Sequence, residues 1–116
     1  MLVFVYGTLR AKQPNHSRCL AEAKLVCSHC VLRDFAMVSM GPFPAAYRKQ
    51  GSTIVGEIYE IDKPILDRLD RLEGYPSFYR RAKVTNPFGI MWIYYRLVED
   101  CKRYPVIPSG DWLNRS

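Results

Sequence analysis

One carboxylate, Glu73, has a position suited to proton transfer. It follows an apolar segment, 65–72, whose spacing of three to four residues predicts a helix, and it precedes Gly74, which can end that helix in the left-handed conformation. The unpaired carbonyls of a helix C-terminus and apolar neighbours such as Tyr75 and Phe78 disfavour a negative charge. Both effects raise the pKa of Glu73 toward the range of a general base. A solvated carboxylate that happens to precede a capping glycine remains the alternative.

A second candidate element follows the first apolar run of the chain. Leu2 to Tyr6 is continuously apolar and β-branched, which predicts a buried strand, and Gly7, Thr8 and Leu9 come next. A glycine directly after a strand lets successive backbone N–H groups point into one concavity, where they can bind a carboxylate or an oxyanion. A plain tight turn has the same sequence.

Several reaction classes lose support because their motifs are missing. The chain has only two histidines and contains no nucleophile elbow, no phosphate-binding G-x-x-x-x-G-K-[ST] loop and no G-x-G-x-x-G fingerprint. Covalent acyl transfer, phosphoryl transfer and nicotinamide chemistry are therefore disfavoured. A carboxylate acting with a backbone anion loop remains.

The cysteines offer an incomplete metal site. Cys27 and Cys30 have the C-x-x-C spacing of half a zinc site, but only His16, Cys19 and Cys101 are left to complete it. Their apolar surroundings suit cysteines that pack as small hydrophobic residues. We predict no metal and no structural disulfide.

Length and charge limit the class of protein further. The chain has 116 residues, 48% of them hydrophobic and 24% charged, which predicts one globular domain over residues 1–116. The net charge of +6 favours anionic partners in general, but the basic residues are scattered, so we expect no nucleic-acid partner. No apolar run is long enough for a membrane span, and no signal peptide is recognisable. We expect a soluble, cytoplasmic protein with no membrane partner; its oligomeric state is left open.

The order of predicted elements indicates the fold class. We expect strands over 2–6, 31–40, 53–61, 79–85 and 90–97, helices over 15–27 and 62–73, an irregular loop at 41–44 and an irregular C-terminal tail. Asn86 to Gly89 is a turn sequence that makes the last two strands a hairpin. Gly56 inside a strand indicates a bulge or a close backbone approach. Helices are too few for a doubly wound sheet, so an α+β domain with a closed or strongly curved mixed sheet fits best.

Five segments in this order resemble one known family over nearly the whole chain. They are Val3-Phe4-Val5-Tyr6-Gly7-Thr8-Leu9, Gln13-Pro14-Asn15-His16, Gly56-Glu57-Ile58-Tyr59, Leu69-Asp70-Arg71-Leu72-Glu73-Gly74 with Tyr79 and Arg80, and Ser109-Gly110-Asp111-Trp112-Leu113. Together they resemble the gamma-glutamylcyclotransferase-like family, in particular its gamma-glutamylamine cyclotransferase branch and small bacterial members. Each segment alone is weakly specific, whereas the combination is specific.

The resemblance implies a small mixed β-barrel flanked by two or three helices, with a pocket at one end. It implies that Glu73 is the catalytic acid/base and that the loop of Tyr6, Gly7, Thr8 and Leu9 binds the α-carboxylate of a γ-glutamyl group. Tyr79 would be a hydrogen-bond donor at the pocket or a structural residue of the hairpin.

Two further expectations depend on the same resemblance. Arg10 and His16 would contact an anionic substrate or leaving group, or lie solvated at the surface. The segment 40–46 would border the pocket, and its apolar rings would favour an aliphatic or aromatic leaving group over a charged one.

The activity implied is that of a transferase or lyase acting on a γ-glutamyl amide. The α-amine of the substrate attacks its own γ-carbonyl, releasing 5-oxoproline and a free amine. Because the substrate supplies its own nucleophile, this chemistry requires no metal or cofactor. A non-catalytic protein that binds a small acidic metabolite on the same fold is the alternative.

Overall fold

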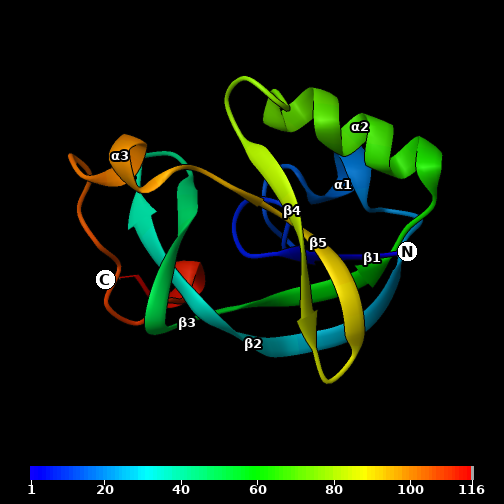
Figure 1. Ribbon diagram of the computed structural model, residues 1–116. Helices are drawn as coiled ribbons and strands as arrows, with labels where there is room; N and C mark the ends of the chain where they lie inside the picture. Colours follow the sequence, from blue (N-terminus) through cyan, green and yellow to red (C-terminus); the bar gives the residue numbers. More distant parts are fainter. Residues whose placement is uncertain (116) are drawn as a thin grey trace.

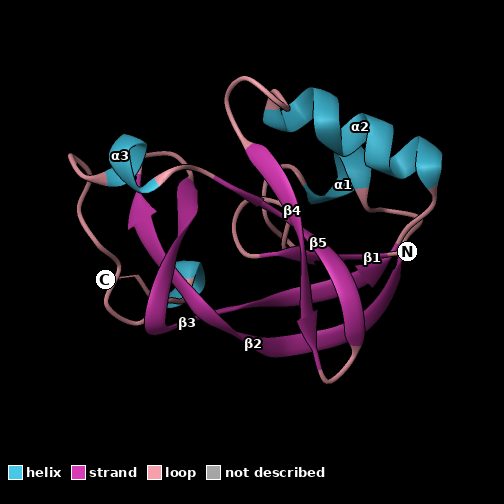
Figure 2. Cartoon of the chain, viewed as in Figure 1, coloured by secondary structure: helices cyan, strands magenta, loops and turns pink. Residues whose placement is uncertain are grey.

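Five strands form one mixed sheet in the computed structural model, which describes residues 1–115. The elements in chain order are β1 (Leu2–Val5), α1 (His16–Cys19), β2 (Lys24–Ser39), β3 (Pro44–Glu60), α2 (Lys63–Glu73), β4 (Arg80–Asn86), β5 (Gly89–Tyr95), α3 (Val98–Cys101) and a short 3-10 turn, η1 (Trp112–Asn114). The strand order is β2-β3-β1-β5-β4, with β1 antiparallel to β3 and parallel to β5 (Figures 1 and 2). The shortest strand is thus the central one. These elements confirm the predicted α+β class.

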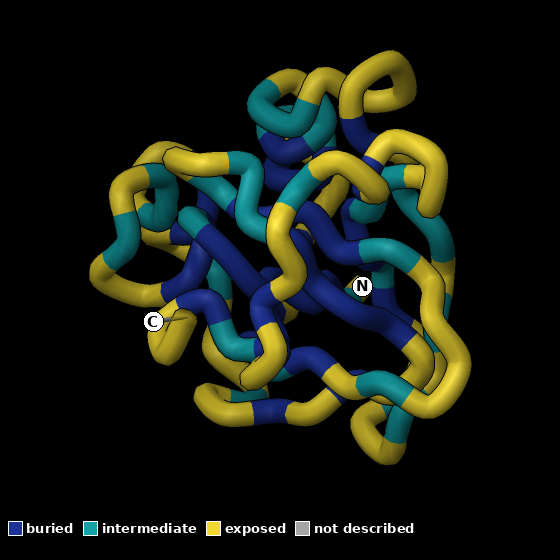
Figure 3. The backbone as a smooth tube through the Cα atoms, turned by 90° about the vertical axis from the view of Figure 1, so that its left-hand side faces the viewer, coloured by how far each residue is buried: buried dark blue, intermediate teal, exposed yellow. Residues whose placement is uncertain are grey.

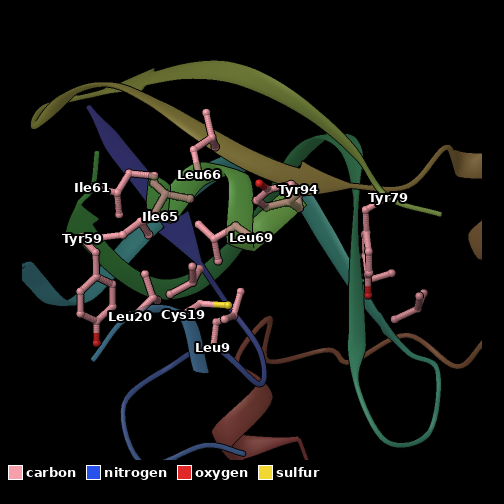
Figure 4. Packing of buried hydrophobic residues seen from close by; sticks show 14 of the residues in the cluster. Leu9, Cys19, Leu20, Tyr59, Ile61, Ile65, Leu66, Leu69, Tyr79 and Tyr94 are labelled. Atoms are coloured by element: carbon pink, nitrogen blue, oxygen red, sulfur yellow. The ribbon is translucent and has the colours of Figure 1, made fainter. Parts of the chain in front are cut away.

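The central strand is apolar throughout because both of its faces are covered. Val3 and Val5 pack into one apolar cluster with the buried stripe of α2, while Phe4, between them, packs into a second cluster on the other face. This alternation is the two-residue period of a strand. Figure 4 shows the first cluster, with Ile65 and Leu69 of α2 among its side chains. In Figure 3 the buried segments run through the middle of the molecule, with exposed loops around them.

Helix α2 begins and ends where the sequence predicts. The Asp62 side chain accepts a hydrogen bond from Ile65 N at 3.1 Å, which caps the first turn. Gly74 has φ +66, and the N–H groups of Gly74 and Tyr75 donate to the carbonyls of Arg71 and Asp70. This is a Schellman ending, and it makes Glu73 the last helical residue.

Gly56 permits the close contact between β3 and β1. A Cβ at this position would lie 2.3 Å from the Val5 carbonyl oxygen and 2.7 Å from the Phe4 ring. The predicted close backbone approach is confirmed. Since β1 leads directly into the candidate anion loop, this contact also sets the position at which the loop begins.

The predicted helix over 15–27 is wrong for most of its length. Only His16–Cys19 is helical, and Lys24 already begins β2. Leu25 and Cys27 pair with Tyr59 and Ile58 of β3, so strand pairing prevails over the helical spacing of the apolar residues.

The loop predicted at 41–44 is irregular over 41–43, whereas Pro44 and the C-terminal tail are more regular than predicted. Pro44 pairs with Ser39 as the first residue of β3, where its missing N–H costs least. In the tail, Ile107 N donates to the Met37 carbonyl at 2.8 Å, and Trp112 is buried within the second apolar cluster. Long-range backbone pairing, which short sequence windows do not reveal, orders both segments.

The sheet is strongly curved, with β2 and β4 at its two edges. At one end the edges meet through Asn86 of β4, whose Nδ2 lies 3.6 Å from Cys30 Sγ of β2. Backbone pairing that would close the sheet is not present between β2 and β4 among residues 1–115, so the closed barrel stays a prediction.

Replacement of Gly56 tests this packing. Gly56→Ala should lower the free energy of unfolding by at least about 1–3 kcal/mol, because the added methyl group meets backbone that cannot move without shifting β1. Urea unfolding followed by circular dichroism measures the loss. Gln50→Ala, at an exposed position of the same strand, should stay within about 0.5 kcal/mol of the wild type. Equal urea midpoints for Gly56→Ala and the wild type would contradict the close approach of β3 to β1 at Gly56.

Candidate active site

A cavity of about 370 Å³ opens where the loop after β1 meets the end of α2. This volume lies at the lower end of the range for small-molecule sites. The residues around it come from four regions of the chain and are Phe4, Val5, Tyr6, Gly7, Thr8, Leu9, Asn15, Phe43, Pro44, Leu72, Glu73, Gly74, Phe78, Tyr79 and Tyr94. The cavity brings together all of the predicted site residues. Their chemical roles remain predictions.

Glu73 is the one acidic side chain in the cavity wall. Burial raises its pKa to about 7. Among the described residues, no donor forms a hydrogen bond or an ion pair with its carboxylate, so nothing in the protein opposes this shift. The position of Glu73 at a helix C-terminus also predicts a raised pKa, but burial is the cause found in the structure. Near neutral pH, Glu73 can therefore both accept and release a proton.

The loop after β1 offers unpaired backbone donors to the same cavity. The Asn15 side chain donates to Thr8 Oγ1 at 2.9 Å, and Asn15 N donates to the Thr8 carbonyl at 2.9 Å. Within residues 1–115, the N–H groups of Gly7, Thr8 and Leu9 donate to no protein acceptor. Unpaired N–H groups beside a cavity suit a carboxylate ligand.

Gly7 is required for packing rather than for an unusual backbone angle. A Cβ here would lie 2.6 Å from Pro44 Cγ, so the loop can lie against the start of β3 only without a side chain. The sequence argument assigned this glycine to the turn itself. In the structure the glycine instead allows close contact with Pro44, and both residues line the cavity.

Three tyrosines line the cavity, and each phenol proton is used within the protein. Tyr6 donates to the Tyr94 carbonyl at 2.7 Å and accepts from Ala46 N at 3.0 Å. Tyr79 donates to the Pro44 carbonyl at 2.7 Å, and Tyr94 donates to Asp70 Oδ1 at 2.6 Å. Burial, and the charge of Glu73 after it, raises the pKa of Tyr79, so this hydroxyl stays protonated. Toward a ligand, Tyr79 therefore offers an oxygen lone pair in this geometry, not the predicted proton.

Arg10 belongs to a buried ionic cluster instead of the cavity wall or the solvated surface. Its Nε lies 2.9 Å from Glu57 Oε2, and its Nη1 lies 2.9 Å from Asp111 Oδ1. Glu57 also accepts from Ala11 N and from the Tyr59 hydroxyl, each at 2.8 Å. Arg10 and Glu57 are 4% and 5% exposed, which leaves a lost partner without water to replace it. The cluster holds the chain immediately after the candidate anion loop.

The other secondary candidates also lie outside the cavity wall. His16 Nδ1 is 2.9 Å from the Leu9 carbonyl, and the imidazole packs beside the Tyr59 ring. Cys30 is buried, and burial raises its pKa to about 11, with the Cys27 thiol as the next cause, so Cys30 remains a protonated thiol. Within residues 1–115, no three His, Cys, Asp or Glu side chains are grouped to hold a metal ion.

Several wall residues were not singled out from the sequence. Of the segment 40–46, only Phe43 and Pro44 line the cavity. Asn15 appears in the family motif but carried no predicted role, and Tyr94 lies in β5, far along the chain from the other site residues. The apolar alternation of β5 alone does not show which face meets a cavity.

Comparisons with known proteins agree with this geometry. The family model described as "Gamma-glutamyl cyclotransferase, AIG2-like" matches residues 3–114. The gamma-glutamylcyclotransferase family protein YtfP of Escherichia coli is 38% identical over 117 residues, covering 99% of this chain and 98% of the relative. The gamma-glutamylaminecyclotransferase of Rattus norvegicus is 37% identical over 88 residues, covering 69% of this chain and 59% of the relative.

A solved structure shows the same fold. The crystal structure of an AIG2-like protein from Mus musculus superposes with a TM-score of 0.75 at 29% identity, covering 95% of this chain and 87% of that one. None of the helices in the described part of this chain has the length and apolar character of a membrane span.

The raised pKa of Glu73 can be measured directly. Carbon-detected NMR of the side-chain carboxyl should give a midpoint near pH 7, with the resonance identified by its absence from Glu73→Gln. The folded protein then holds this proton more tightly than the unfolded chain, whose carboxyl titrates near 4.5. The stability of the wild type relative to Glu73→Gln should therefore fall as the pH rises from about 4.5 to about 7, and then level off. A midpoint below pH 5 would refute the buried carboxyl.

The ionic cluster makes a separate prediction about stability. Arg10→Met should lower the free energy of unfolding by about 3–5 kcal/mol, because it leaves Glu57 buried and short of a partner. Arg10→Met combined with Glu57→Gln should recover part of this loss. Arg33→Met, at an exposed position of β2, is the matched control and should change stability by less than about 0.5 kcal/mol. Urea unfolding of the wild type and the three variants measures these changes. A loss for Arg10→Met as small as that for Arg33→Met would show that Arg10 behaves as a surface charge.

Proposed function

Because this chain belongs to the gamma-glutamyl cyclotransferase, AIG2-like family, we propose that it converts a γ-glutamyl amide to 5-oxoproline and a free amine. The observation that carries the proposal is the unpartnered Glu73 in a cavity shared with the unpaired N–H groups of the loop after β1. An acid/base and an anion site are the two parts that this reaction needs. The substrate brings the nucleophile.

Binding comes first in the proposed reaction. The N–H groups of Gly7, Thr8 and Leu9 receive the α-carboxylate of the γ-glutamyl group. Tyr79 Oη, whose proton goes to Pro44, has a lone pair to accept from the α-amino group. Held at both groups, the glutamyl chain is folded so that its α-nitrogen approaches its γ-carbonyl carbon. Such proximity contributes up to about 7–11 kcal/mol in well-oriented reactions.

Proton transfer by Glu73 completes the reaction. The α-nitrogen forms a bond to the γ-carbonyl carbon and gives its proton to the Glu73 carboxylate. The bond from that carbon to the leaving nitrogen then breaks, and Glu73 returns the proton to this nitrogen. The five-membered lactam and a free amine are the products, so atoms and charge balance without a covalent enzyme intermediate.

The pKa of Glu73 suits both halves of this cycle. An α-amino group titrates at about 8, so near neutral pH about a tenth of the donor carries the neutral α-amine that attacks. A carboxyl group with a pKa of about 7 is partly ionised at this pH, so it can accept the proton that the attacking nitrogen loses and return it to the leaving nitrogen. The same carboxylate argues against a protein that only binds an acidic metabolite. A site that only binds a small acid has no use for Glu73, whereas the proposed reaction uses this side chain as its acid/base.

Substitution of Glu73 tests the proposal. The wild type should release 5-oxoproline from at least one member of a panel of γ-glutamyl amides, and Glu73→Gln should lower kcat by about 10²–10⁴-fold. Liquid chromatography of 5-oxoproline measures the rate. Glu60→Gln, an exposed carboxylate at the end of β3, should match the wild type.

The outcomes separate the two hypotheses. Equal rates for Glu73→Gln and the wild type would refute the role of Glu73. Binding of 5-oxoproline or glutamate without turnover of any donor would favour the binding protein.

A further inference from the structure

The cavity has a buried floor and an aromatic rim. On the floor, Tyr6, Leu9 and Tyr79 are each less than 10% exposed. At the rim, Phe78 is 41% exposed and Phe43 is half-buried, although both rings line the cavity. The residues proposed to bind and protonate the γ-glutamyl part, which are the loop 6–9, Tyr79 and Glu73, line the same cavity. The proposed reaction assigns no part of the substrate to the two rings of the rim.

The Phe78 ring is held in place although it is exposed. It makes edge-to-face contacts with Phe43 at 6.0 Å and Tyr79 at 5.1 Å between ring centroids. The Arg96 guanidinium lies 4.2 Å from its centroid, and Phe78 N donates to the Gly74 carbonyl at 2.8 Å. A ring fixed by these contacts loses little conformational entropy when a ligand packs against it. It is therefore a preorganised apolar surface at the mouth of the cavity.

Arg96 determines which charges this surface tolerates. Its nearest carboxylate oxygen, on the half-exposed Asp100, is 3.9 Å away, and its Nη1 lies 3.9 Å from Met40 Sδ. Its Nε is buried and has no hydrogen-bond partner among the described residues. The positive charge is thus weakly compensated, and it already occupies a cation–π position on Phe78. A second cation at the rim would be repelled by Arg96 and would gain little from the ring.

We infer that Phe43 and Phe78 form the subsite for the leaving amine and select donors whose amine carries an aliphatic or aromatic group and no second positive charge. The inference rests on the proposed function and adds the class of amide to it. The scissile bond lies between the γ-glutamyl part on the floor and an apolar group packed against the two rings. An amine carrying a second, positively charged group fits poorly because of Arg96.

Three donors test this selectivity. The γ-glutamyl hexylamide and γ-glutamyl 5-aminopentylamide have chains of the same length and differ by a terminal methyl or ammonium group, and γ-glutamyl benzylamide adds a ring. The wild type should prefer the hexyl donor over the aminopentyl donor by about tenfold or more in kcat/KM. Equal values, or a preference for the aminopentyl donor, would overturn the inference.

Variants then connect this selectivity to the rim. Phe78→Ala should lower kcat/KM about tenfold for the hexyl and benzyl donors and much less for the aminopentyl donor, so that the ratio approaches one. Phe88→Ala is the matched control, because Phe88 is 49% exposed in the β4–β5 turn and lies outside the cavity wall. Arg96→Gln should narrow the ratio by improving the aminopentyl donor. If the ratio of kcat/KM between the hexyl and aminopentyl donors is the same in Phe78→Ala as in the wild type, the subsite is contradicted.

Binding separates the failure of this inference from the failure of the proposed function. Calorimetry with Glu73→Gln measures the affinity for each intact donor in the absence of turnover. A preference for the hexyl donor that disappears in Glu73→Gln combined with Phe78→Ala supports the subsite even if the wild type releases no 5-oxoproline. Equal affinities for the hexyl and aminopentyl donors would refute the subsite even if the wild type turns both over.

Discussion

Arg10 and Glu57 are almost fully removed from water, and such a pair persists only when every hydrogen-bonding site on it finds a partner. Glu57 meets this condition through Arg10, the Ala11 backbone and the Tyr59 hydroxyl, while Arg10 also reaches Asp111. These contacts bind β3 and the C-terminal segment to the residues just after the anion loop. The loop is therefore held at both ends, since its start follows β1, which lies against Gly56.

The cavity leaves little chemistry open besides proton transfer and anion binding. The hydroxyl protons of Tyr6, Tyr79 and Tyr94 are all directed to protein acceptors. What remains for a ligand is the Glu73 carboxylate, an oxygen lone pair of Tyr79, the Thr8 hydroxyl and backbone N–H groups. That set suits a substrate that carries its own nucleophile, as the proposed lactam-forming reaction requires.

The end of α2 connects the proposed catalysis to the proposed selectivity. The Schellman ending at Gly74 places Glu73 at the cavity, and the same turn leads within a few residues to Phe78 at the rim. The backbone contact between Phe78 and Gly74 joins the two. A change in this short segment would therefore affect both the acid/base and the choice of leaving amine.

Local signals in the sequence were sufficient for β1, for both ends of α2, for the β4–β5 hairpin and for Gly56, because caps, turns and alternation act over a few residues. They failed at 20–27, where residues with helical spacing form a turn and then, from Lys24, the start of β2 paired with β3. The family motifs also predicted Glu73 and the loop from Tyr6 to Leu9 as site residues; they line one cavity, and their roles stay predictions.

Only the tertiary structure decided the environment of these groups. The burial that raises the pKa of Glu73, the pairing of Arg10 with Asp111 and the inclusion of Phe43 and Tyr94 in the wall all join segments distant in the chain. Burial and charge pairing depend on which segments meet in space, and that is a property of the whole fold rather than of any short stretch of residues.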